Sequence, residues 1–449
     1  MLTRLLLVFF IPLSLWATEF LQCKHLLNRT SFGIDQMHLQ TCLKSDSYHS
    51  FLHTLIYQDR REFKRAEKNY HPRLLRPSRK MRELNSKERK AFRKKRRESY
   101  MHLKEYWFKQ MLTTEDPFKE KMILFWHNHF TSSLKKVGQA SLLYKQHILL
   151  EKHALGNFAE LLHAIIEDPA MLSYLDNRGN RKGHPNENLA RELLELFTMG
   201  EGNYKEKDIQ ALARTLTGYS LNRNLHFKFK RNIHDKSTKV FLGQKGHFDA
   251  HDIVEIILAQ PATSKFMVKK LWLTFIDNQA EPKEVERLAQ LFKIGNYEMK
   301  PLLEALFTSK YFTTSSNYGT MVKSPVDLIV GTLRSFDYRD FDAKMGIQYS
   351  RRLGQDLFDP PNVKGWSGGE TWVNTHTLLL RKAFLNRFLR GENMKHLHYG
   401  LFNTCPVPEN QREICAAKTL LPVNIFMTPA PTFKQSLRTI FQHPLYQLK

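Results

Sequence analysis

The chain has 449 residues, which is enough to bury a large core and suggests two or three domains. Its 42% of apolar residues is typical of a globular protein, and no stretch after the first residues approaches the roughly 20 apolar residues of a membrane-spanning helix. The formal net charge is +25, and residues 59–98 alone carry 18 basic against 6 acidic side chains, which is nearly half of the excess.

The N-terminus has the pattern of a secretory signal peptide over residues 1–17. One early arginine precedes an apolar run, and the small residue Ala17 stands before a polar change, although Leu15 makes the cleavage site imperfect. The run is too short to span a membrane, and Gln22 before Cys23 argues against lipid attachment. We therefore expect an exported, soluble protein, either periplasmic or extracellular.

Four cysteines fit an oxidising compartment. Cys23 with Cys42 and Cys405 with Cys415 are the sequence-local pairs among three connectivities. No pair has the spacing of a zinc or redox motif, so two disulfides are favoured over free buried thiols.

The chain is predicted to be mainly α, a multi-helix globular body with one small β-hairpin and long Gly/Pro loops. Helical periodicity recurs along most of its length, and alternation appears only between Ser220 and Gly243. After the signal peptide we expect an N-terminal helical segment, a basic arm or insertion that is partly helical after Ser86, a helical core, and a C-terminal segment with a Cys405–Cys415 loop and a final helix; these are residues 18–57, 58–99, 100–400 and 401–449.

The basic arm has two interpretations, and both stay open. In an exported protein its natural counterions are an anionic lipid, lipopolysaccharide or an acidic glycan of the envelope. The alternative is a solvated arm without a specific partner. A specific nucleic-acid partner is disfavoured, because the chain has an export signal and no recognisable nucleic-acid fold.

The first candidate site residues lie in FWHNHF, at the end of a helix that Asp116-Pro117 should start. His127 and His129 are about 200° apart on a helix, so the two cannot ligate one metal ion unless the helix ends there. His129 falls on the apolar side and is expected to be a hydrogen-bonded core histidine. His127 is the better site candidate.

The densest polar pattern follows in PNENLARELLELFTMG, residues 185–200. Pro185 suits the first position of a helix and Gly200 the residue just past its end. One face is apolar, and the other predicts the ion pairs Glu187–Arg191 and Arg191–Glu195. That polar face, which also holds Asn188 and Glu192, is either a salt-bridged surface or the lining of a cleft.

Two later segments carry further candidates. His234, Asp235 and Lys239 stand in HDKSTK, where a His beside an Asp acts as a base or ligand, or equally as a turn-stabilising pair. In GHFDAHD, helix capping by Asp249 is favoured over a metal site. The loop LGQDLFDPPNVKGWSGGETWVNT would form a pocket wall or a core edge, and its exposed chemistry includes Asn362, Lys364 and Trp366.

Four of these motifs, FWHNHF, PNENLARELLELF, HDKSTK and PPNVKGW, resemble the signatures of a bacterial family of unknown function numbered eighteen hundred. The resemblance covers most of the mature chain except the basic segment and the region near Pro406. Thr217-Gly218-Tyr219 stands where the family usually has Thr-Gly-Trp, which makes this a divergent member. The matching polar positions favour a cleft. Members are often encoded beside sulfatase-like proteins, so the resemblance also implies a sulfatase-like partner.

Two functions follow. Walker, dinucleotide-binding, nucleophile-elbow, HExxH and CxxC motifs are missing, which disfavours nucleotide chemistry. One candidate is a hydrolase or transferase acting on an anionic envelope or extracellular polymer, with Glu192, Glu195 and His127 as acid/base groups or ligands of a divalent metal. Its expected substrate-binding residues are Asn188, Arg191, His234, Asp235, Lys239, Asn362, Lys364 and Trp366. The alternative is a non-catalytic envelope assembly or binding protein that docks through the arm, and the sequence does not decide whether the protein is an enzyme.

Overall fold

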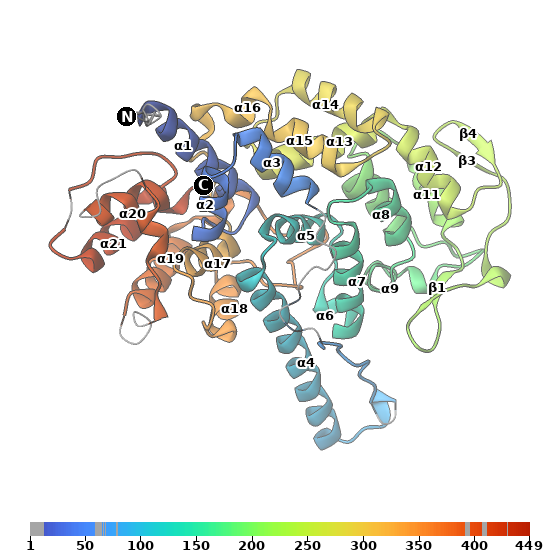
Figure 1. Cartoon of the computed structure of the whole chain (residues 1–449). Helices are drawn as coiled ribbons and strands as arrows, with labels where there is room; N and C mark the ends of the chain where they lie inside the picture. The colour runs from blue at the N-terminus through green and yellow to red at the C-terminus, as the bar shows by residue number, and fades with distance from the viewer. Residues whose placement is uncertain are drawn as a thin grey trace, which may run out of the picture.

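The computed structural model describes residues 13–58, 65, 67, 69–77, 80–390, 396–405, 411–428 and 430–449, and side chains from Glu19 onward. The first twelve residues of the expected signal peptide and residues 59–64 of the arm lie outside this part of the chain. The described part is mainly helical, as the periodicity predicts, with 21 α-helices and two small two-stranded sheets (Figure 1).

The helices follow one another along the chain with few strands between them. The first group is α1 (Leu13–Thr30), α2 (Gln36–Leu43), α3 (Tyr48–Tyr57), α4 (Ser86–Thr113), α5 (Pro117–His129), α6 (Leu134–Val137), α7 (Ala140–His153), α8 (Phe158–Ile165), α9 (Pro169–Tyr174), α10 (Asn188–Glu192) and α11 (Glu206–Thr215). The second group is α12 (Ala250–Ala259), α13 (Pro261–Phe275), α14 (Pro282–Ile294), α15 (Met299–Phe307), α16 (Lys310–Thr313), α17 (Pro325–Ser335), α18 (Ala343–Arg352), α19 (Thr375–Phe388), α20 (Arg412–Leu420) and α21 (Phe433–Gln442).

Side-chain caps start several of these helices where the sequence predicts them. Asp116 accepts a hydrogen bond from Lys119 N at 3.1 Å, and Pro117 occupies the first turn of α5, where a missing N–H costs nothing. Asp249 accepts from the backbone of His251 and Asp252 at the start of α12. The capping interpretation of GHFDAHD is therefore confirmed.

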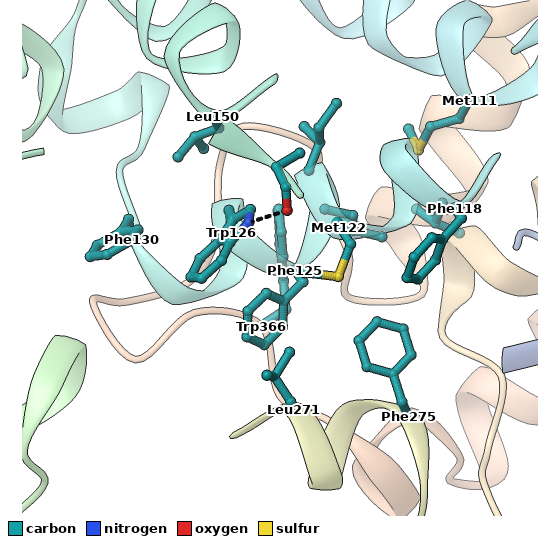
Figure 2. Packing of buried hydrophobic residues seen from close by; sticks show 14 of the residues in the cluster. Met111, Phe118, Met122, Phe125, Trp126, Phe130, Leu150, Leu271, Phe275 and Trp366 are labelled. Atoms are coloured by element: carbon teal, nitrogen blue, oxygen red, sulfur yellow. Dashed lines mark hydrogen bonds between the residues drawn. The ribbon is translucent and has the colours of Figure 1, made fainter. Parts of the chain in front are cut away.

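Helix α5 lies in the middle of the core and is buried on almost every side. Figure 2 shows Phe118, Met122, Phe125 and Trp126 of this helix among buried residues of other elements. The Trp126 indole donates a hydrogen bond to the carbonyl of Ala154 at 3.0 Å, so its polar atom is satisfied inside the apolar cluster. This packing holds FWHNHF rigidly at the centre of the molecule.

Helix α4 has two halves with different environments. From Leu103 onward its apolar side chains are buried, and it packs against α5, α7, α17 and α18. From Ser86 to Glu98 it carries eight basic and two acidic residues, and most of these side chains are exposed. In Figure 1 this half extends away from the body, as expected for an arm that is helical after Ser86.

The number of β-hairpins differs from the prediction. The sequence predicts one hairpin between residues 220 and 243, whereas the described chain forms two antiparallel pairs: β1 (Tyr219–Leu221) with β2 (Phe227–Phe229), and β3 (Lys239–Phe241) with β4 (Gln244–Gly246). The second turn contains Gly243 with φ +82°, a conformation that glycine adopts without steric cost. Each pair is only three residues long on each side.

The prediction of disulfides over free thiols is confirmed, and the structure selects the sequence-local pairs. Cys23–Cys42 joins α1 to α2, and Cys405–Cys415 ties the segment before α20 to that helix. Disulfides of this kind form in oxidising compartments. In the described part of the chain, no helix combines the length and apolar character needed to cross a membrane.

Candidate functional site

The polar segment of residues 185–200 starts later than its sequence pattern predicts. Pro185 precedes the helix rather than opening it, and α10 begins at Asn188. The reason is a side-chain turn: Asn186 Oδ1 accepts from Asn188 N at 2.9 Å, while Asn186 N donates to Asn180 Oδ1 at 3.0 Å. The predicted end is confirmed, since Gly200 has φ +77°.

The helix also changes type halfway. From Leu193 to Thr198 it is a π-helix, η3, in which Met199 N donates to Leu194 O, five residues back, at 2.9 Å. The Thr198 side chain also bonds within this turn, since its Oγ1 donates to Leu193 O at 2.6 Å. Such π segments are rare and occur frequently at functional sites. The apolar face of the segment is buried as expected, and Glu192 and Glu195 are half-buried.

The polar face of this segment forms a network with two residues that follow it, Tyr204 and Glu206. We call this network the carboxylate cluster; its members are Glu187, Arg191, Glu192, Glu195, Tyr204 and Glu206. The predicted pair of Glu187 with Arg191 is present at 3.1 Å. The predicted pair of Arg191 with Glu195 is wrong, because Arg191 instead pairs at 2.7 Å with Glu206, at the start of the neighbouring helix α11. Glu195 accepts from the Tyr204 hydroxyl at 3.2 Å. Asn188 is exposed at the beginning of α10.

Within the carboxylate cluster, the surroundings of Glu192 raise the pKa of its carboxyl group. Partial burial raises its pKa, the neighbouring carboxylate of Glu195 raises it further, and Lys364 and Arg191 act in the opposite direction. Glu192 in turn helps to raise the pKa of Tyr174. Lys364, a predicted binding residue from a distant loop, therefore lies near the carboxylate cluster.

His127 is buried, and its partners are not these carboxylates. It is 3% exposed, its Nε2 lies 3.0 Å from His147 Nδ1, and its ring packs on Trp107 at 4.5 Å between centroids. Burial, followed by the nearby His147, holds the pKa of His127 well below its usual value. Among the described residues no three His, Cys, Asp or Glu side chains form a group that could hold a metal ion. The structure thus does not assemble His127, Glu192 and Glu195 as metal ligands.

The neighbours of His127 form a buried polar cluster of their own. Trp107 Nε1 donates to Glu120 Oε1 at 2.7 Å, and Glu120 is fully buried. Burial raises the pKa of Glu120 to about 8, although the Trp107 hydrogen bond acts in the opposite direction. His129 is a core histidine as predicted, since its Nε2 lies 3.0 Å from the carbonyl of Phe197.

Glu120 gives a prediction about the pH dependence of stability. Its folded-state pKa of about 8 lies above that of an unfolded glutamate, about 4.3, so the stability it contributes is fully present below pH ~4.3 and is lost as pH rises through 8. The loss approaches about 1.4 kcal/mol per pH unit. Glu120→Gln keeps an acceptor for Trp107 and should remove this slope. Urea unfolding from pH 5 to 9 checks this, and parallel curves for variant and wild type would contradict it.

The side chains of His234, Asp235 and Lys239 in HDKSTK form hydrogen bonds with residues near the two hairpins. His234 Nδ1 lies 2.8 Å from Thr217 O, and Asp235 accepts from Arg214 Nε at 2.8 Å. Lys239 is buried and donates to the carbonyls of Asp235 and Ser237. Burial would raise the pKa of Asp235, but hydrogen bonds from Arg214 and Ser237 hold it well below its usual value. These contacts support the turn-stabilising interpretation over a base or ligand.

Asn128 is a site residue that the sequence interpretation missed. Its Oδ1 accepts from Trp366 N at 2.7 Å, so it joins FWHNHF to PPNVKGW. Asn362 Oδ1 accepts from Lys364 N at 2.9 Å and forms the turn before Gly365. The prediction that Trp366 is exposed is wrong, because its ring is buried, whereas Asn362 and Lys364 are exposed as predicted. The only available signal was the amide between two histidines in a family motif.

Trp366 forms part of the wall of a cavity between α5, α13 and the loop that follows Gly365. The cavity has a volume of about 150 Å³, and Asn128, Trp372 and the charged side chains Lys121, Asp327 and Lys449 also line it. The loop therefore forms part of a pocket wall, one of its two predicted roles, through Trp366 and Trp372. The cavity is separate from the carboxylate cluster, none of whose members lines it.

Comparison with known proteins gives one match. Residues 25–447 match the family described as "Protein of unknown function (DUF1800)". No curated protein and no solved structure matches the chain.

Proposed function

Because the chain belongs to the DUF1800 family, whose function is unknown, we propose a function from its own geometry: it is an exported protein that docks on a phosphate-bearing anionic lipid surface through helix α4. The projecting basic half of α4 is the observation that carries this proposal (Figure 1). The two disulfides are compatible with an extracytoplasmic location.

The basic half of α4, residues 86–98, forms a cationic extension of the body. Asn85 and Glu88 form a capping box at its tip, and the buried half of the same helix anchors it in the body. Thirteen residues at 1.5 Å each place the charges along about 20 Å. The exposed basic side chains are Lys87, Arg89, Lys90, Arg93, Lys94, Lys95 and Arg97.

The chemistry favours an electrostatic rather than an inserted interaction. Successive residues turn by about 100° around a helix, so these cations cover most of its circumference and leave no continuous apolar face. A membrane-inserting helix needs such a face. Each Lys or Arg near an anionic surface contributes about 1 kcal/mol, and salt screens this attraction. Phospholipid and lipopolysaccharide present the same phosphate chemistry.

The test compares two variants with equal charge change. Four substitutions to glutamine on the arm, at Arg93, Lys94, Lys95 and Arg97, should weaken binding to anionic vesicles by about 4 kcal/mol, close to a thousandfold. The control replaces four exposed cations of the β region by glutamine: Lys228, Arg231, Lys236 and Lys245. Vesicle sedimentation at low and high salt measures both.

We expect the control variant to bind like the wild type, and wild-type binding to fall as salt rises. Phospholipid vesicles with and without lipopolysaccharide separate the two lipid sources, and neutral vesicles should bind neither variant nor wild type. Equal losses in both variants would mean that only net charge matters. Displacement by a soluble acidic glycan and not by lipid would replace the lipid surface with that polymer.

A second candidate is a hydrolase or transferase acting on an anionic envelope polymer, with Glu192 and Glu195 as its acid/base pair. The raised pKa of Glu192 beside a second carboxylate supports it, since such pairs divide acid and base roles. Arg191, Lys364 and Asn188 would hold substrate charge. Activity on acidic glycans that disappears in Glu192→Gln and persists in Glu286→Gln, which lies outside the cluster on α14, would support it. Metal analysis of the same proteins tests a metal-dependent form. Equal activity in both variants would exclude Glu192.

A further inference from the structure

The cavity beside Trp366 has a charged floor that the proposed docking function does not use. Asp327, in the first turn of α17, forms ion pairs with Lys121 and with Lys449, the latter at 2.7 Å. All three side chains are at least nine-tenths buried, and all three line the cavity. Two side-chain ammonium groups thus face the single side-chain carboxylate of Asp327.

The surroundings add further buried cations rather than anions. Burial lowers the pKa of Lys323, Arg29 and Arg381, and each lies close enough to Asp327 for its charge to act in the opposite direction. Nε of Arg381, and Nε and Nη1 of Arg29, have no hydrogen-bond partner in the described part of the chain. Burial lowers the pKa of Lys449 to about 7. Other nitrogens of both arginines donate hydrogen bonds, and neither arginine lines the cavity. An excess of buried positive charge is nevertheless costly, and an anion bound nearby relieves that cost.

The walls have a different character from the floor. Trp366, Trp372 and Phe125 supply aromatic surface, and the exposed residues Leu273 and Gly368 place the mouth of the cavity at the protein surface. A cavity of about 150 Å³ is large enough for a ligand of the size of one aromatic ring. An apolar wall above a cationic floor suits a ligand with both properties.

We propose that this cavity binds a small organic monoanion of the carboxylate class. Its anionic group lies on the ammonium groups of Lys121 and Lys449, and its apolar body packs against Trp366 and Trp372. The buried cationic side chains near Asp327 outnumber its carboxylate, which favours a negatively charged ligand. The site is independent of lipid docking, since none of its residues belongs to the arm.

The test uses benzoate as the probe and benzamide as its neutral counterpart of similar shape. Calorimetry and tryptophan fluorescence on the full chain should show benzoate binding, with benzamide and inorganic phosphate at least about tenfold weaker. Thermal unfolding, which needs no variant, should shift upward with benzoate and not with benzamide. Equal binding of benzoate and benzamide, or no shift with benzoate, would overturn the proposal. Equally tight phosphate binding would remove its organic part.

A pair of variants locates the probe. Lys449→Met should weaken benzoate binding about tenfold or more, because it removes one ammonium group from the floor. Lys269→Met is the matched control: this exposed lysine lies on α13, the helix that contributes Leu273 to the mouth, but it does not line the cavity. If the control loses as much binding as Lys449→Met, the anion is bound elsewhere. If Lys449→Met does not fold, the thermal shift of the wild type decides.

Discussion

Asp327→Ala is expected to lower the free energy of unfolding by about 3–5 kcal/mol, because it leaves two buried lysines without their carboxylate. Asp327 pairs with Lys121 and Lys449 and also caps α17 together with Ser324. Removing one partner of a buried pair costs far more than removing a surface pair, since the remaining charges cannot return to water. Urea unfolding followed by circular dichroism measures the difference.

Glu286→Ala is the control for this prediction. Glu286 pairs with Lys265 at 2.6 Å, but both side chains are close to half exposed, so the loss of stability should be far smaller than for Asp327→Ala. Similar losses in the two variants would mean that the Asp327 pairs behave like surface pairs.

The same carboxylate predicts a response to acid. Burial alone would raise the pKa of Asp327, but Lys121 and Lys449 hold it well below its usual value. Its stabilisation is therefore fully present above the pKa of an unfolded aspartate, about 3.9, and is lost as pH falls below that value. Below pH ~4 the wild type should lose stability with falling pH more steeply than Asp327→Ala. Acid titrations at fixed urea test this, and equal slopes would contradict it.

Gly365→Ala is expected to destabilise the protein by about 3 kcal/mol or more. Gly365 has φ +91°, and a Cβ there would lie 2.3 Å from Asn128 Oδ1 and 2.7 Å from Asn128 O. The left-handed backbone costs about 1–2 kcal/mol for alanine, and the clash forces the loop away from α5. That movement breaks the Asn128 bond to Trp366 N and opens the cavity wall. Thermal and urea unfolding measure the stability, and benzoate binding should fall with it.

Gly183→Ala separates the cost of the left-handed backbone from the cost of the steric clash. Gly183 has φ +81°, but a Cβ there would meet no atom within 4 Å. Its variant should therefore show only the backbone cost of about 1–2 kcal/mol. If Gly365→Ala is no worse than Gly183→Ala, the close approach to Asn128 contributes nothing to stability.

Regular helices were the most predictable part of the fold. Apolar residues recurring at helical spacing along most of the chain predicted the mainly helical fold, and Asp116 with Pro117 located the start of α5. Capping depends on residues a few positions apart, so local sequence contains the needed information. The π-helix after Glu192 was missed because its apolar positions also fit an α-helical pattern.

The candidate site was predictable only in part. The polar residues of α10 and η3 do lie together, and the Glu187–Arg191 pair spans one turn of helix, so spacing alone implies it. The partner of Arg191 on α11 and the separation of His127 from Glu192 depend on how distant helices pack. A helical wheel shows on which side of a helix a histidine lies, but it does not show whether the ring will contact a carboxylate or another buried ring.

The sequence by itself determined the helical class and the concentration of positive charge near Ser86, and it favoured two disulfides over free thiols, because periodicity, composition and cysteine count are read directly from the chain. Only the tertiary structure decided that Lys121, Asp327 and Lys449 meet beneath Trp366, and that Asn128 holds the loop above them. These residues are separated by up to about three hundred positions in the chain. Their meeting follows from the burial of apolar faces of α5, α13 and α17 in one core, which no short-range pattern encodes.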